Sequence, residues 1–495
     1  MRVVLSGLID IKLQARSDQT LSRQLYDQLR RAILKGALPA GHRLPSSRAL
    51  ASQLAISRNT VSDVVDQLAM EGYLEVARGR RPVVAQSKPA LVRGKAAGRT
   101  RSAKPQLSHW AQHIRRSEWP LANEGLARPF VPGLGDSREF PHDLWARCLR
   151  RAARGTPGQR RPDVNRSALR DALLRHLIEH RGVRAQARQI MILPSAQAAI
   201  ELVARIVLNK GDLAWLESPG YGGARAALEA AEARVAGVQL DRSGLSIKGR
   251  RDKPRLIFVT PSHQYPTGRL MTIDRRQELL AFAASAGAAV IEDDYDSEFH
   301  YDGRPVAALQ GLGDSDNVFY IGTFSKATFA DIRLGYVIVP EDWVELFEIA
   351  QRHSGLIASV PVQDALAEFI VDGHFSAHIR KMTRLYHRRR DHLVRALNTL
   401  AGARLMVSPP SGGMQLVVDL HSDIDDCEIA AQLDKAGVAA RPLSRHFIGQ
   451  IRRGGLFLGF AAWNEREIDA GVDVIDQVLR KWPVRERRRG GARPS

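Results

Sequence analysis

Residues 289–296 read AVIEDDYD and residues 318–326 read VFYIGTFSK. Each stretch is a short apolar run that ends in polar side chains, which is typical of a buried strand and the loop after it. Helical patterns separate four further apolar runs, at 190–193, 213–216, 256–259 and 334–339. This alternation predicts an α/β domain over residues 126–482, with a mainly parallel sheet that helices cover on both faces.

Polar motifs follow three of these runs, at the strand ends where α/β sheets bind ligands. Ser195, Ala196 and Gln197 follow the run at 190–193 and begin a helical stretch. Free N–H groups at a helix start can bind phosphate, although Ser195 is equally suited to cap the helix. The stretch at 292–296 holds four carboxylates. A divalent metal, a solvated turn, or one carboxylate paired with a cationic heterocycle nitrogen would each account for it.

Lys326 lies just past the run at 318–321, and the hydroxyls of Thr323 and Ser325 precede it. A lone lysine is usually a surface group, but one in this position can form a Schiff base with a carbonyl cofactor. Arg333, seven residues later, can add a phosphate contact. Pyridoxal phosphate needs a lysine, an acid for its ring nitrogen and a phosphate cup, so the three motifs together predict this cofactor. No metal site is predicted.

The first 85 residues have a different organisation. Three helices are predicted there, over 20–36, 46–54 and 58–71. Two short β-rich runs, at 73–77 and 82–85, flank an arginine-rich turn. This order is that of a winged helix-turn-helix, assigned to residues 12–85, whose third helix enters the DNA major groove. A three-helix protein-binding module is the alternative.

The net charge of +20 is unevenly distributed. Residues 1–125 hold 21 Lys and Arg against 9 Asp and Glu, whereas residues 126–495 hold 52 against 44. A basic end beside a nearly balanced body favours DNA binding over the protein-binding alternative. Residues 86–125 are predicted to be a basic flexible linker, because their composition gives no sustained apolar period. Residues 483–495, with five Arg and one Glu, are predicted to be a basic tail.

The remaining composition favours a reducing cytoplasm. No window approaches about 18 uninterrupted apolar residues, so no transmembrane helix is predicted. Asp10 and Lys12 interrupt the N-terminal stretch, which does not resemble a signal peptide. The two cysteines, Cys148 and Cys427, fit neither a metal spacing nor a disulfide framework.

The N-terminal domain contains several short motifs: LPSSR at 44–48, Ala51 and Leu54, SRNTV at 57–61 and EGYL at 71–74. With these motifs it resembles the GntR family of bacterial regulators. The resemblance implies that operator DNA is contacted by Arg48, Ser57, Arg58, Asn59 and Thr60. The hairpin adds the wing arginines Arg78, Arg80 and Arg81, which can reach phosphates or the minor groove. The wing departs from the family pattern, since Pro82 alters which backbone groups are free there.

The larger domain carries its own motifs: FPHDLW at 140–145, TPSHQYPTG at 260–268, the acidic stretch at 292–301 and GTFSK at 322–326. They resemble the fold-type I aminotransferases. From residue 15 to residue 480 the chain resembles the MocR subfamily of GntR regulators, which join a winged helix to an aminotransferase-like domain that binds pyridoxal 5'-phosphate.

The resemblance implies roles for individual residues. Lys326 would carry the internal aldimine, Asp293 would pair with the ring nitrogen, and Tyr295 would hydrogen-bond the phenolic oxygen. Tyr221 would stack on the ring. The phosphate would be held by Ser195, Ala196, Gln197, Thr323, Ser325 and Arg333.

Two departures bear on the ligand. Enzymes of this fold usually have Asn before Pro-Thr-Gly, where this chain has Tyr265, with His263 and Gln264 nearby. They also carry an Arg in a C-terminal pattern that clamps the substrate carboxylate, whereas residues 457–460 here read FLGF. Four arginines are candidates for replacing it: Arg441, Arg445, Arg452 and Arg453.

The resemblance therefore implies a cytoplasmic bacterial transcriptional regulator, associated with the nucleoid when bound to DNA. It would bind an operator as a homodimer and sense a small amine, an amino acid or pyridoxal phosphate through an aldimine at Lys326. No membrane contact is expected. The alternative is a working aminotransferase with an appended DNA-binding domain. We expect no physiological turnover, with half-transamination as a side activity at most.

Overall fold

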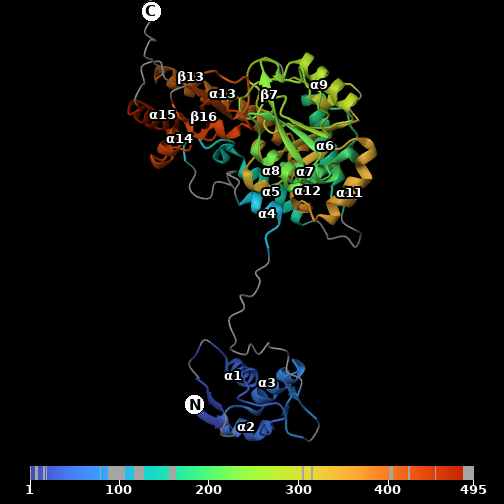
Figure 1. Ribbon diagram of the computed structural model, residues 1–495, viewed down its shortest axis with the longest axis vertical. Coiled ribbons are helices and arrows are strands. Elements are labelled where there is room, and N and C mark those ends of the chain that lie inside the picture. Colours follow the sequence, from blue (N-terminus) through green and yellow to red (C-terminus); the bar gives the residue numbers. More distant parts are fainter. Residues whose placement is uncertain are drawn as a thin grey trace, which may run out of the picture. The chain divides into compact units, whose positions relative to one another are not determined.

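The computed structural model describes two compact units, Met1–Pro105 and Gln106–Ser495, within these ranges: 2–5, 9–14, 17, 19–77, 80–86, 106–115, 128–154, 163–303, 306–313, 316–400, 405–421, 424–451 and 453–482. Figure 1 labels their elements. Most of the predicted linker, the predicted tail and Arg78 lie outside the described residues. Among the described helices, none is long and apolar enough to cross a membrane.

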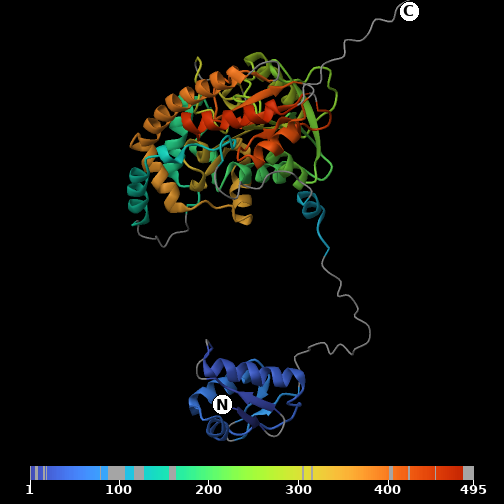
Figure 2. The same cartoon turned by 90° about the vertical axis from the view of Figure 1, so that its left-hand side faces the viewer.

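The first unit is a winged helix-turn-helix, as predicted (Figures 1 and 2, blue). It contains helices α1 (Leu21–Lys35), α2 (Ser47–Leu54) and α3 (Arg58–Met70) and the hairpin β3 (Leu74–Glu75) and β4 (Val83–Val84). The helix caps follow the sequence: the side chains of Thr20, Ser46 and Ser57 accept from backbone N–H groups in the first turns, and Gly36 ends α1 in the left-handed region. An antiparallel pair that the sequence did not predict, β1 (Arg2–Leu5) and β2 (Ile9–Lys12), precedes α1.

The second unit is built on an eight-stranded sheet of order β5-β12-β11-β10-β9-β6-β7-β8. The strands are β5 (Ile190–Leu193), β6 (Leu213–Ser218), β7 (Arg234–Asp241), β8 (Gly244–Leu245), β9 (Leu256–Val259), β10 (Ala289–Asp293), β11 (Val318–Thr323) and β12 (Gly335–Ile338). β12 and β8 pair antiparallel with their neighbours, and the remaining pairs are parallel. The predicted α/β class with a mainly parallel sheet is confirmed.

Helices cover both faces of this sheet, because its strands are apolar on both sides. Met191 and Leu193 point to one face, which is packed with α7 (Ala196–Val207), α8 (Gly222–Ala230) and α11 (Val344–His353). Ile190 and Ile192 point to the other, where α5 (His142–Ala153), α6 (Ser167–Arg181), α9 (Ile273–Ala286) and α12 (Val360–Val371) lie. A short helix, α4 (His109–Ile114), lies within the predicted linker and contacts α8.

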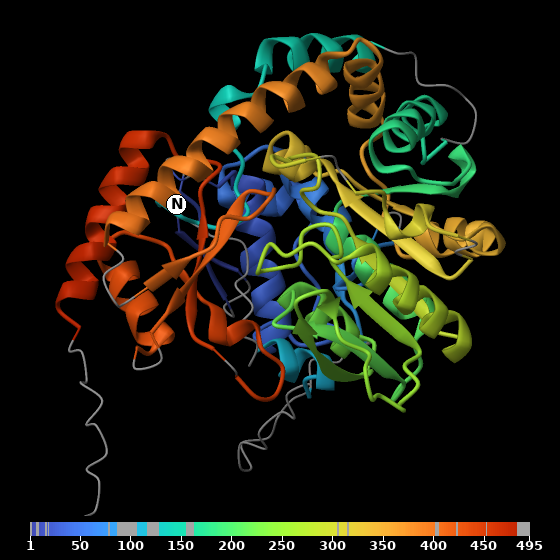
Figure 3. The ribbon, with the colours of Figure 1, turned by 90° about the horizontal axis from the view of Figure 1, so that it is seen from above.

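A second, smaller sheet lies beside the large one in the same unit (Figures 1 and 3, orange and red). Its order is β13-β14-β16-β15, with strands β13 (Leu405–Val407), β14 (Gln415–Leu420), β15 (Arg441–Pro442) and β16 (Gly455–Gly459). Helices α13 (His374–Leu400), α14 (Asp426–Lys435) and α15 (Glu465–Arg480) accompany it. The long helix α13 contacts both α12 and α15, so it joins the two parts of the unit.

Candidate cofactor and DNA sites

Lys326 lies in α10 (Phe324–Ala327), the short helix that directly follows β11. Its Nζ donates to the carbonyl oxygen of Gly133 at 2.5 Å. Burial lowers the pKa of Lys326, while the charges of Asp296 and Asp293 oppose the loss of its proton. A lysine in this setting is more readily deprotonated than a surface lysine, which is the state that attacks a carbonyl group.

Asp293 is the last residue of β10, the strand next to β11, and its side chain is almost fully buried. Burial raises the pKa of its carboxyl group to about 8, and the nearby charges of Asp294 and Asp296 add to the rise. Asp293 Oδ1 has no hydrogen-bond partner among the described residues. A buried carboxyl oxygen without a partner is costly unless a donor reaches it. The ring nitrogen of pyridoxal phosphate would supply that donor, so the site fits the cofactor.

The other acids of the same stretch have partners within the protein. Asp294 is bound by Arg181 at 2.8 and 3.2 Å and by the hydroxyl of Tyr320. Glu292 accepts from the backbone N–H groups of Leu309 and Gln310 at 2.7 and 2.9 Å. These acids are buried and so do not form a solvated turn. Of the three interpretations of the sequence, the pairing of one carboxylate with a heterocycle nitrogen agrees best with this arrangement.

The residues predicted to hold the phosphate come from the ends of three neighbouring strands. Gly335 of β12 pairs with Leu193 of β5 on one side and with Thr323 of β11 on the other. A side chain at Gly335 would place its Cβ 2.5 Å from the backbone nitrogen of Ala196. Only glycine therefore lets β12 approach the start of α7 so closely.

Individual side chains of this group already have structural roles. Ser195 caps α7 by accepting from Ala198, and Thr323 accepts from the backbone of Ser325. Gln197 donates to the carbonyl of Gly223 at 3.0 Å. Arg333 is exposed, with its backbone in the left-handed region, two residues before the glycine of β12. The structure thus brings the predicted residues to one end of the sheet. Backbone N–H groups at this end are the donors that a phosphate group would need.

Four aromatic residues of the second unit pack against one another. Tyr221 lies edge-on to Tyr265, with their ring centres 5.2 Å apart, and Tyr265 meets Phe457 in the same way at 5.2 Å. The charge of Asp293, added to burial, raises the pKa of Tyr221, which places Tyr221 near that carboxylate. Tyr295 lies 5.9 Å from Tyr265 between ring centres. Gln415 Nε2 donates to the Tyr295 hydroxyl at 3.3 Å.

The structure distinguishes among the four arginines that are candidates for binding a carboxylate. Arg441, in β15, pairs in register with Phe457 and therefore lies on the same face of the small sheet. Burial raises the pKa of Tyr265 to about 12, and the charge of Arg441 and a hydrogen bond from it oppose that rise. Arg453 is instead bound to Asp419 at 2.7 and 2.9 Å, and Arg445 is exposed. Arg452 lies outside the described residues.

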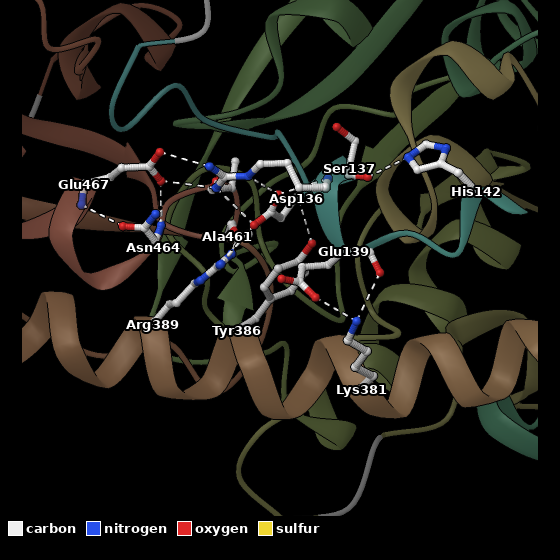
Figure 4. A network of polar contacts seen from close by, with 12 residues as sticks. Asp136, Ser137, Glu139, His142, Lys381, Tyr386, Arg389, Ala461, Asn464 and Glu467 are labelled. Atoms are coloured by element: carbon white, nitrogen blue, oxygen red, sulfur yellow. Dashed lines mark hydrogen bonds and ion pairs between the residues drawn. The ribbon is translucent and has the colours of Figure 1, made fainter.

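A network that the sequence did not predict fixes the segment containing Gly133 (Figure 4). Asp136 is bound by the buried Arg389 of α13 at 2.9 Å and by Arg138 at 2.8 Å. Arg138 also reaches Glu467 at 3.0 Å. The hydroxyl of Tyr386 accepts from the backbone N–H of Asp136 at 3.0 Å. Because Arg389 and Tyr386 lie 253 and 250 positions from Asp136 in the chain, no local spacing signalled their contact.

The predicted DNA-contacting residues lie on the surface of the first unit. Arg48, Arg58, Asn59, Arg80 and Arg81 are exposed, and Thr60 is half-buried. The hydroxyl of Ser57 is already engaged, since it accepts from the backbone N–H of Thr60 at 3.0 Å and contacts its hydroxyl at 2.8 Å. Ser57 thus fixes the start of α3, the helix predicted to enter the major groove, while Arg58 and Asn59 stay available for DNA.

Comparisons with known proteins agree with both units. The family model described as aminotransferase class I and II matches residues 134–475, and that of bacterial regulatory proteins, gntR family, matches residues 21–84. The probable rhizopine catabolism regulatory protein MocR of Rhizobium meliloti is 36% identical over 469 residues, covering 93% of this chain and 94% of that protein. The HTH-type pyridoxine biosynthesis transcriptional regulator PdxR of Corynebacterium glutamicum is 30% identical, covering 92% and 95%.

Among solved structures, Pyrococcus horikoshii kynurenine aminotransferase in complex with PMP superposes with a TM-score of 0.67 at 24% identity. It covers 76% of this chain and 95% of its own. The multiple substrate aminotransferase of Thermococcus profundus gives the same TM-score and identity, covering 76% and 97%. Both show that the second unit has the aminotransferase fold.

Proposed function

From the premise that this chain belongs to the MocR subfamily of GntR-family transcriptional regulators, we propose that it responds to a small amine or amino acid, or to pyridoxal phosphate itself, at Lys326. The chain is a transcriptional regulator whose aminotransferase-like domain uses pyridoxal phosphate. Its winged helix binds operator DNA. The identity of the effector, the individual contacts and a homodimer that presents two winged helices are our proposal.

The observation that carries the proposal is the pair of Lys326 and Asp293. The lysine is held beside a carboxyl group whose oxygen lacks a partner among the described residues. When bound, the cofactor supplies an aldehyde carbon to which the lysine amine can bond. An incoming primary amine can replace the lysine at this carbon. Asp293 would hold the ring nitrogen, Tyr295 the phenolic oxygen, and the strand ends at Ser195, Thr323 and Arg333 the phosphate.

The position of Arg441 favours an effector that carries a carboxylate as well as an amine. Its charge acts on Lys326 and on Tyr265, so it lies within reach of the same space. A guanidinium group binds a carboxylate through two parallel hydrogen bonds. We propose that Arg441 does here what the arginine missing from residues 457–460 does in the enzymes.

The segment around Gly133 connects the cofactor site to distant helices of the second unit. The carbonyl of Gly133 accepts directly from Lys326. Asp136 and Arg138 connect the same segment to α13 and α15. A ligand alters DNA affinity only if it favours one arrangement of such a segment over another. We propose that binding at Lys326 shifts this segment.

A spectroscopic titration coupled to DNA binding tests the proposal. The full-length chain is loaded with pyridoxal phosphate and titrated with amines and amino acids, while its affinity is measured for a DNA duplex selected from a random pool. We expect a visible absorbance band that is lost in Lys326→Ala and kept in Lys381→Ala, an exposed lysine of the same unit. One ligand should shift the band and change DNA affinity together.

Other outcomes would reject the proposal. A protein without a band in excess cofactor would contradict the cofactor site. Rapid turnover with an added keto acid, without any change in DNA affinity, would identify a working aminotransferase, which the complete set of cofactor residues keeps as the second candidate.

A further inference from the structure

Behind Tyr295 lies a buried pair of ionisable side chains, His263 and Asp296. The exposed fractions are 5% for the His263 side chain and 1% for Asp296. His263 Nδ1 lies 3.1 Å from Asp296 Oδ1 and 3.2 Å from the hydroxyl oxygen of Tyr295. The pair does not belong to the phosphate cup or to the site of the ring nitrogen, so the proposed function gives it no role.

Counting hydrogens fixes the direction of these contacts. A carboxylate only accepts hydrogen bonds, so the Nδ1 atom facing Asp296 must carry a hydrogen. The same N–H faces the Tyr295 oxygen, which also receives Gln415 Nε2 at 3.3 Å. Both lone pairs of the Tyr295 oxygen therefore meet donors. Its own hydrogen has no acceptor among these neighbours and is directed away from them.

We propose that His263, held by Asp296, is a positioning residue that donates to the Tyr295 oxygen and directs the Tyr295 hydroxyl hydrogen toward the phenolic oxygen of the cofactor. This inference rests on the proposed function, because Tyr295 acts there as the partner of that oxygen. His263 touches neither cofactor nor ligand in this scheme. Its effect passes through Tyr295.

The surrounding backbone leaves room for His263 in one position. A Cβ at Gly413 would overlap the imidazole ring and would lie 2.7 Å from Asp296 Oδ2. Gly413 has a φ of +80°, so glycine is favoured there for conformational reasons as well. On its other side the ring meets Gly268, whose Cβ would lie 2.9 Å from His263 Nε2. This fit holds the Nδ1 edge against Asp296 and Tyr295.

Several charged or ionisable groups face the same space. Arg181 and His300 line a small cavity together with His263 and Asp296. The charge of Asp296 also acts on Lys326, where it opposes the loss of the lysine proton. A change at Asp296 would thus act on Lys326 directly, whereas a change at His263 would act mainly through the Tyr295 hydroxyl. Variants of His263 are therefore the sharper test.

The test is a pH titration of the absorbance of the loaded full-length protein. A hydrogen bond from Tyr295 stabilises the anionic phenolic oxygen, so losing it keeps the chromophore protonated to higher pH. We expect His263→Phe to raise the titration midpoint by about one pH unit, a tenfold change in the proton-dissociation constant, which is the size of one hydrogen bond. His263→Asn, whose amide nitrogen can occupy the place of Nδ1, should restore most of the wild-type midpoint.

A double-variant comparison separates positioning from a general charge effect. In a Tyr295→Phe background, His263→Phe should cause no further shift, because the hydroxyl that it orients is absent. A shift that persists in this background would overturn the inference. So would an unchanged midpoint in His263→Phe that keeps its cofactor and its circular dichroism spectrum. If His263→Phe fails to fold, His263→Leu in the two backgrounds replaces it. Absence of any band in the wild type would instead contradict the proposed function itself.

Discussion

The two units place their functional side chains in opposite environments. Arg48, Arg58 and Asn59 of the first unit are exposed, and their backbone is fixed by local caps such as Ser57. In the second unit Lys326 is half-buried and Asp293 is buried, and their properties depend on neighbours from distant strands and helices. Function is therefore separable from stability in the first unit and coupled to it in the second.

The largest effect is expected where a buried charge would lose its partner. Burial raises the pKa of Asp136, but hydrogen bonds from Arg138 and Arg389 outweigh it and hold that pKa below its usual value. Arg389→Met removes a partner that is itself only 4% exposed, leaving the carboxylate poorly compensated. We expect the free energy of unfolding of the second unit to fall by about 3–5 kcal/mol, measured by denaturant titration.

Arg138→Met is the matched control, because Arg138 binds the same carboxylate from a side chain that is 53% exposed. Its loss should cost less than about 1 kcal/mol. Equal losses in the two variants would contradict the view that burial decides the cost.

The next effect concerns DNA affinity alone. Arg58→Ala removes an exposed cation from the first turn of α3. We expect the free energy of DNA binding to weaken by about 1–3 kcal/mol, with no change in the thermal unfolding of the first unit. Arg23→Ala on α1, which removes a cation paired with Asp27, controls for the change in net charge. A matching loss of stability in Arg58→Ala would show that function and folding are coupled there too.

The features that could be predicted from the sequence are those fixed by local residues or by strand order. The caps of α1, α2 and α3 depend on residues within a few positions, and the sequence placed those helices to within one or two residues. The proximity of Asp293 and Lys326 was also predictable, because carboxyl ends of neighbouring parallel strands share one edge of the sheet. Tertiary contacts between distant segments were not: neither Asp136–Arg389 nor the approach of Arg441 to Tyr265 leaves a local pattern.

A third prediction concerns the pH dependence of the cofactor-free protein. Burial raises the pKa of Asp293 to about 8, that of Glu298 to about 8 and that of Glu217 to about 7. A carboxyl group with a raised pKa in the folded state binds a proton that unfolding releases. Its stability contribution is therefore fully present below about pH 4 and is lost as the pH rises toward 8. Asp293→Asn should flatten this decline by up to about 1.4 kcal/mol per pH unit.

Denaturant titrations of the cofactor-free wild type and Asp293→Asn between pH 5 and 8 measure this difference. Asp252→Asn serves as the control, because that carboxylate is partly exposed and bound to Arg250. Identical slopes for wild type and Asp293→Asn would mean that Asp293 is ionised in the folded protein, which would contradict the raised pKa of its carboxyl group.

The smallest effect concerns Arg441. It tests whether the function of this residue is separable from stability, as in the first unit, or coupled to it. It is half-buried, so its removal should change stability little, yet it lies beside Lys326 and Tyr265. Arg441→Gln should weaken binding of the responding amino acid about tenfold, the loss of one charge-assisted pair, and leave the corresponding amine without a carboxylate unaffected. Absorbance titrations with the two ligands measure the ratio directly. Arg453→Gln, bound to Asp419, is the matched control and should change neither affinity. Equal losses for both ligands would mean that Arg441 supports Tyr265 and the pocket wall, so that its influence on the ligand would be structural.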